Sequence, residues 1–128
     1  MREADRDRGA AVVDFVLVMV LLIPLVLGIM QVALVLHVRN TLAAAASEGA
    51  RSAAPLEASP ADGAARTREM IRKTLDDRYA DHVSASWTTI GGVPATEVQV
   101  RADVPALGLF GPSMSVTVRG HAVRELEP

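Results

Sequence analysis

The chain has 128 residues, of which 50% are hydrophobic and only 3% aromatic, and its formal net charge is −2. The basic residues are scattered among acids rather than gathered in a stripe, so we expect no direct binding to nucleic acid. The absence of cysteine excludes disulfide bonds and thiolate metal sites. The length leaves room for one small domain beside a membrane segment.

An uncharged apolar run occupies residues 15–36, and its only polar side chain is Gln31. As a helix, these 22 residues rise about 33 Å, enough to cross a hydrocarbon core of about 30 Å. The run therefore predicts a single-pass helix in contact with membrane lipid. A secretory signal peptide has a shorter apolar region, of about 7–15 residues, but the alanines at 43–46 would suit cleavage, so that interpretation stays open.

The charges on either side of the run indicate its orientation. Three arginines, at positions 2, 6 and 8, precede it, and two, at positions 39 and 51, follow it closely. Since basic residues favour the cytoplasmic side, the N-terminus is expected in the cytoplasm and the C-terminal part outside the membrane.

Asp14 places a carboxylate at the entrance to the apolar run. At a bilayer centre an ionised side chain costs roughly 2.5–3.5 kcal/mol. In one interpretation Asp14 stays near the headgroups and gains roughly 0.3–1 kcal/mol from the helix dipole. In the other, a hydrophilic leader, residues 1–9, is removed, and the new ammonium group at Ala10 neutralises the Asp14 of an adjacent subunit, which sets the register between the two helices.

Residues 40–54 are rich in alanine, so the membrane helix is expected to continue beyond the bilayer as a stalk and to end before Pro55. Residues 10–54 are thus assigned to one helix. Prolines and glycine among small residues predict a linker over residues 55–63. Residues 64–128 are left for a small exported domain.

The exported domain is predicted to contain one helix and about three strands. Between residues 64 and 79, the apolar side chains that share one helical face are Met70, Ile71, Leu75 and Tyr79. A period of two then predicts strands over residues 98–104 and 114–119, with a further strand over 84–90 and a hairpin connection at 91–94. The expected fold is α+β and pilin-like: a long helix, a short amphipathic helix and a small antiparallel sheet.

The segment 106–112 is an apolar loop between two predicted strands. It either tucks into the core or, if exposed, is a candidate contact with a partner.

Several short stretches together resemble a known family. Residues 8–15 read Arg-Gly-Ala-Ala-Val-Val-Asp-Phe; the apolar run follows, and then Arg-Asn-Thr-Leu at 39–42 and Ser-Glu-Gly-Ala-Arg at 47–51. In this combination, residues 8–51 resemble the TadE-like proteins, which are minor pseudopilins of tight-adherence (Flp-type) pilus systems.

The resemblance implies processing and assembly residues near the N-terminus. A prepilin peptidase would cleave on the cytoplasmic side between Gly9 and Ala10, leaving Asp14 as the acidic fifth residue and Phe15 as the aromatic sixth. The chain departs from the family pattern in having Asp where Glu is typical, which keeps the charge but shortens its reach.

Residues able to perform catalysis are sparse. The one acidic cluster near a histidine comprises Asp76, Asp77, Asp81 and His82, and it lacks the spacing of a calcium loop or a metalloprotease helix. We expect a solvated helix end there, no metal or other cofactor, and no enzymatic activity.

The sequence therefore predicts a structural, minor pseudopilin-like subunit of a tight-adherence pilus or related secretion apparatus. Its expected partners are other pilus subunits, reached through the N-terminal helix, the prepilin peptidase and membrane lipid. Its expected location is the cell membrane, with incorporation into a surface pilus and a role in cell adhesion or secretion. The main alternative is an envelope domain that is simply anchored, or secreted after cleavage near Ala45 or Ala46, and that binds a ligand or partner. A remoter alternative is a small hydrolase that uses Asp81 and His82.

Overall fold

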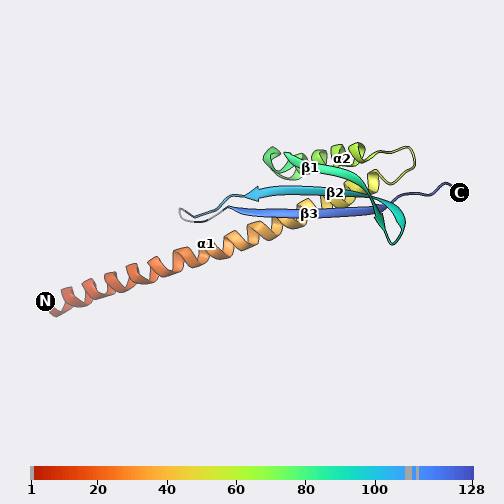
Figure 1. Ribbon diagram of the computed structural model, residues 1–128. Coiled ribbons are helices and arrows are strands. Elements are labelled where there is room, and N and C mark those ends of the chain that lie inside the picture. The colour runs from red at the N-terminus through yellow and green to blue at the C-terminus, as the bar shows by residue number, and fades with distance from the viewer. Residues whose placement is uncertain (1, 109–110, 112) are drawn as a thin grey trace.

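The computed structural model describes residues 2–108, 111 and 113–128, and these form two α-helices, one short 3-10 helix and a three-stranded sheet (Figure 1). The elements in chain order are α1 (Arg2–Ser52), α2 (Pro60–Thr74), η1 (Asp77–Ala80), β1 (His82–Ile90), β2 (Val93–Val104) and β3 (Met114–Val123). The α+β class and the order of long helix, shorter helix and antiparallel sheet confirm the prediction.

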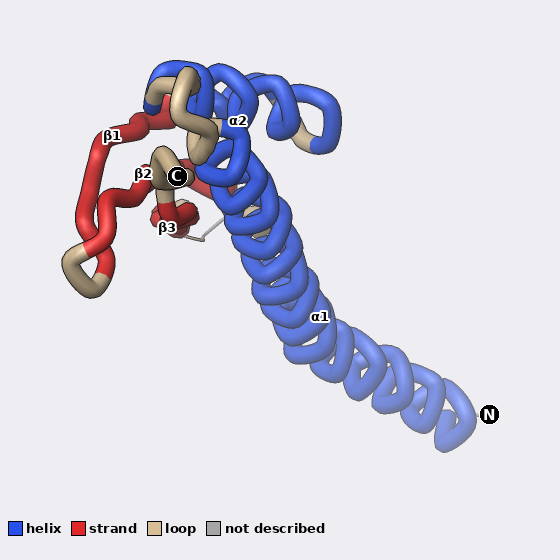
Figure 2. The backbone as a smooth tube through the Cα atoms, turned by 90° about the vertical axis from the view of Figure 1, so that its right-hand side faces the viewer, coloured by secondary structure: helices blue, strands red, loops and turns tan. Residues whose placement is uncertain are grey.

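Helix α1 is the axis of the molecule. Its 51 residues extend about 76 Å, pass through Pro24 without interruption, and end shortly before Pro55, as the alanine-rich sequence predicted. The N-terminal half projects away from the other elements, whereas the C-terminal half lies against the sheet and α2 (Figures 1 and 2). The N-terminal half of this one helix is thus an exposed apolar segment, and its C-terminal half is part of the core of the small domain.

Helix α2 begins earlier than its apolar pattern predicted. Ser59 is the N-cap, Pro60 follows it, and the side chain of Asp62 accepts a hydrogen bond from the backbone N–H of Ser59 at 2.7 Å. That hydrogen bond, together with one from the Ser59 hydroxyl, lowers the pKa of the Asp62 carboxyl. The helix ends at Thr74, so Tyr79 packs from η1 instead of from the helix as expected.

The sheet has the order β1-β2-β3, and both pairs are antiparallel. Strands β1 and β2 form a hairpin in which Ile90 pairs with Val93 across Gly91 and Gly92. Both glycines have positive φ, 57° and 83°, which matches a two-residue turn whose twist suits antiparallel strands. The hairpin therefore lies where the sequence predicted it, but its turn is shorter than the predicted connection over residues 91–94, because Val93 and Pro94 already pair with β1 as the first residues of β2.

One face of the sheet packs on both helices, and the core lies between these two layers. Alternate residues of β2, such as Val98 and Val100, are fully buried against Val38 and Leu42 of α1 and Ile71 of α2. The opposite face carries polar side chains, including Glu97 and His121, which are 2.6 Å apart. This alternation is that of a half-buried antiparallel sheet.

Close backbone approaches hold α1 against its two neighbours. At Gly49, an added Cβ would overlap Thr67 of α2 and lie 2.6 Å from the carbonyl oxygen of Gly63. At Gly120 of β3, an added Cβ would overlap the backbone of Ala46. Glycine at these crossings lets the helix axis lie closer to its neighbours than larger side chains would allow.

Replacing Gly120 with alanine should destabilise the domain. The new methyl group would meet rigid backbone atoms of α1, and overpacking of this kind costs roughly 1–3 kcal/mol. Chemical unfolding of the full chain in detergent micelles measures the loss. Gly108→Ala is the matched control because a Cβ there meets nothing within 4 Å. Equal stability of the two variants would contradict the close approach of β3 to α1.

Candidate functional site: the membrane helix and the groove beside it

The N-terminal half of α1 is an exposed apolar surface. Its large side chains, such as Phe15 and Leu21, are 61% and 76% exposed, and in α1 the first fully buried residue is Val38. Within the described part of the chain, α1 is the one helix long and apolar enough to cross a membrane. This combination fits a single-pass membrane anchor.

The four predicted processing and assembly residues lie near the beginning of this surface. Gly9, Ala10, Asp14 and Phe15 are all exposed, and all belong to the uninterrupted helix. Ala10 and Asp14 are one turn apart, so they lie on the same side of α1. The exposure leaves these positions accessible to another molecule, while their roles in cleavage and subunit pairing stay predictions.

The C-terminal half of α1 has the opposite character. Val38, Leu42, Ala45 and Ala46 are at most 2% exposed and belong to the core of the small domain. The outward-facing residues between them are polar or small. The helix therefore changes from an exposed apolar rod to one wall of a packed domain within about two turns after residue 31.

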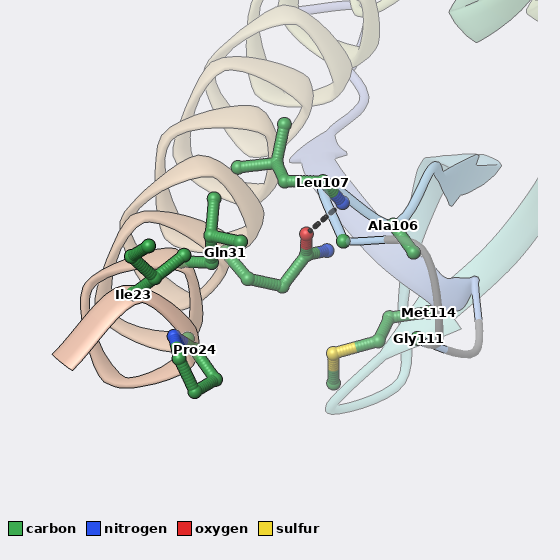
Figure 3. Close-up of a pocket in the computed structure, with 10 residues that line it drawn as sticks. Ile23, Pro24, Gln31, Ala106, Leu107, Gly111 and Met114 are labelled. Carbon is green, nitrogen blue, oxygen red and sulfur yellow. Dashed lines mark hydrogen bonds between the residues drawn. The ribbon is translucent and has the colours of Figure 1, made fainter. Parts of the chain in front are cut away.

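Gln31, the one polar side chain of the apolar run, binds the connection between β2 and β3 (Figure 3). Its Nε2 donates a hydrogen bond to the carbonyl oxygen of Pro105 at 3.2 Å, and its Oε1 accepts one from the backbone N–H of Leu107 at 2.8 Å. The side-chain amide thus satisfies one backbone acceptor and one backbone donor of the loop. These contacts join residues more than 70 positions apart in the sequence.

A groove of about 480 Å³ lies between α1 and this connection (Figure 3). Among the residues that the structure describes, the side chains that line it are apolar apart from Gln31. The α1 wall consists of Ile23, Pro24, Leu27, Gly28 and Gln31, and the other wall consists of Ala106, Leu107, Gly108, Gly111 and Met114. A Cβ added at Gly28 would meet nothing within 4 Å, so the missing side chain leaves space there.

The predicted contact loop, residues 106–112, forms part of this groove. Leu107 is 44% exposed, and the described part of the loop lies against the apolar run of α1 rather than inside the domain core. Residues 109, 110 and 112 lie outside the described residues. Sequence reasoning missed the link to Gln31, although a lone amide in an apolar run is a signal that some polar partner is needed.

One member of the acidic cluster near His82, Asp76, has a local structural role. The side chain of Asp76 accepts a hydrogen bond from the backbone N–H of Arg78 at 3.1 Å and so caps η1. Asp77, Asp81 and His82 are exposed. Among the residues that the structure describes, no group of three or more His, Asp or Glu side chains is arranged to hold a metal ion.

Comparison with known families gives one match. Residues 9–51 match the family model described as TadE-like protein, which confirms the resemblance predicted from the sequence. The matched segment covers most of α1 and stops at its C-terminal end. Searches of curated proteins and of solved structures found no match.

Replacing Gln31 with leucine should release the loop. The backbone N–H of Leu107 would lose its acceptor, and a net hydrogen-bond contribution of about 0.5–1.5 kcal/mol corresponds to amide exchange faster by up to about tenfold. Hydrogen exchange of the full chain in micelles, resolved by residue, measures this. Gln99→Leu, on the outer face of the sheet, is the control. Unchanged exchange at Leu107 in the Gln31 variant would mean that this bond does not hold the loop.

Proposed function

We propose that the chain is a structural, minor pseudopilin-like subunit that takes part in assembling a tight-adherence pilus or related secretion apparatus. The observation that carries the proposal is the coincidence of the family match with α1: residues 9–51 include both the exposed apolar rod and the helical wall of the domain. A helix with a bare apolar half can lie in lipid and afterwards pack laterally on other helices. Its action would be recognition and assembly rather than catalysis.

In this proposal the prepilin peptidase removes residues 1–9 on the cytoplasmic side of the membrane. The scissile bond, between Gly9 and Ala10, lies in an exposed part of the chain, where a peptidase has access. Cleavage would create an ammonium group four residues before Asp14. The remaining helix would stay in the membrane as a single-pass anchor with the domain outside.

Asp14 would then pair with the N-terminal ammonium of a neighbouring subunit. An unpaired carboxylate within a bilayer costs roughly 2.5–3.5 kcal/mol, whereas opposite charges 4 Å apart attract by about 4 kcal/mol at an effective dielectric constant of about 20. Pairing therefore offsets the cost of the carboxylate once the helices pack together. Phe15, exposed beside it, would contribute to the same helix contact.

The packing of α1 favours this proposal over secretion with loss of the helix. Cleavage near Ala45 or Ala46 would remove Val38 and Leu42, whose burial contributes roughly 1.5–3 kcal/mol each, and would leave the inner face of the sheet partly uncovered. A domain of this size cannot readily absorb such a loss. Retention of the helix is therefore the more consistent outcome.

The N-terminal residue of the mature protein tests the processing step. We expect mass spectrometry of the protein purified from membranes of its own host to find a chain that begins at Ala10. A Gly9→Leu variant should keep residues 1–9, because a branched side chain replaces the small residue before the cut, while Gly108→Leu should be processed normally. A start near Ser47 would overturn the proposal in favour of ordinary secretion. An uncleaved N-terminus would overturn the pairing of Asp14, because no ammonium group would then exist at Ala10.

Replacing Asp14 with alanine should impair assembly but not membrane insertion. Loss of the charge pair should lower incorporation into the pilus or secretion assembly by about tenfold or more, equivalent to about 1.4 kcal/mol. Asp14→Glu, which restores the residue typical of the family, should assemble at least as well as the parent chain, and Asp77→Ala is an exposed-acid control. Co-purification with the assembly and membrane fractionation provide the two measurements. Equal incorporation of the alanine variant would rule out the pairing.

A further inference from the structure

We propose that the described residues 105–108 and 111 of the connection between β2 and β3 form a second membrane-contacting element, which enters the outer leaflet beside α1 and leaves the groove to a lipid acyl chain. The inference rests on the proposed function only in that α1 spans a membrane; it needs neither leader cleavage nor assembly into a pilus. It follows from where the groove lies along α1.

The position of the lining residues along α1 gives the depth of the groove in the bilayer. If residues 15–36 span the hydrocarbon core, Gln31 lies about 7.5 Å inside its outer boundary, and Leu27 lies about 13 Å inside. Pro105 and Leu107 are hydrogen-bonded to Gln31, so they lie at that same depth. The end of the sheet nearest the projecting half of α1 therefore overlaps the outer leaflet (Figure 1).

Strands β2 and β3 change from polar to apolar side chains at a level that agrees with the polar boundary on α1. On α1 the apolar run ends at Leu36 and His37 follows; on the sheet Asp103 pairs with Ser115, and the next pair is Val104 with Met114. From Gln31 to His37 the helix rises about 9 Å, and from Ala106 back to Asp103 the strand extends about 10 Å. Both elements thus change from polar to apolar at about the same level.

Two backbone groups of the loop, on Pro105 and Leu107, meet the hydrogen-bonding requirement of a lipid environment. Backbone groups in hydrocarbon must find partners inside the protein, and Gln31 supplies a donor to Pro105 and an acceptor to Leu107. In exchange, the loop satisfies the amide of Gln31, which would otherwise be an unpaired polar group in lipid. If this part of the protein lay in water, nothing would favour apolar side chains on both walls of the groove around Gln31.

The occupant that fits this groove is an acyl chain. Leu107 and Met114 are 44% and 47% exposed, and the opposite wall is formed by side chains of the spanning segment itself. A groove with one wall in the bilayer is open to lipid along its length. The described side chains of its lining include one amide, that of Gln31, which is already hydrogen-bonded, and no charged group. Acyl chains in the groove therefore meet no charged side chain among the described lining residues.

Single-cysteine labelling tests the proposal, because the full chain has no cysteine. Leu107→Cys carries an environment-sensitive fluorophore in vesicles of phosphatidylcholine and phosphatidylglycerol, and Met114→Cys is a second probe of the same groove. Val32→Cys, on the exposed side of α1, is the reference for a probe in the membrane. Thr89→Cys, at the opposite end of the sheet, is the reference for a probe in water. Brominated lipids quench from the bilayer, and iodide quenches from water.

We expect brominated lipids to quench the probes at Leu107 and Met114 to an extent close to that at Val32, and at least about threefold more than at Thr89, with iodide giving the reverse order. If both groove probes behave like Thr89 while Val32 reports lipid, the loop lies in water and the proposal fails, although the anchor stands. If the groove probes are shielded from both quenchers, protein fills the groove, which also overturns the proposal. If Val32 itself reports water, α1 does not span there, and the proposed function fails with it.

Discussion

The rest of the structure depends on how closely α1 approaches its neighbours. A single helix serves both as the membrane-spanning segment and as one wall of a small core. Because the chain has few aromatic side chains, this core is packed through short distances between its helices and strands instead of through large side chains. Gly49 and Gly63 bring α2 to α1, and Gly120 brings β3 to it. With these elements in place, the inward-facing valines of β2 are buried against α1 and α2.

The sequence predicted the types of element well because their periods are clear. The long apolar run, the alternation in β2 and β3, and the paired glycines of the hairpin each have a local physical cause. The start of α2 was missed because its signal lies in the capping residues Ser59 and Asp62, not in the apolar pattern. Tyr79 was assigned to the helix for the same reason, since apolar spacing alone does not show where a helix stops.

The candidate site divides in a similar way. Ala10 and Asp14 could be placed on one helical face from sequence alone, and the structure adds their exposure, because any partner they bind lies outside this chain. The groove could not be predicted: it arises from contacts between Gln31 and a loop more than 70 residues away, and from the space left at Gly28. Such features depend on tertiary packing, which periodicity does not encode.

The continuity of α1 also has a mechanical consequence. The anchor enters the domain without an intervening loop, and its last turns lie beside β3. Just beyond the ends of both elements, the backbone N–H of Glu125 donates a hydrogen bond to the carbonyl oxygen of Ala54 at 2.9 Å. A load that pulls the domain away from the membrane therefore acts along the helix and is carried in shear. Many side chains on α1, α2 and β3 then resist the load at the same time, whereas a flexible tether would peel the contacts away one after another.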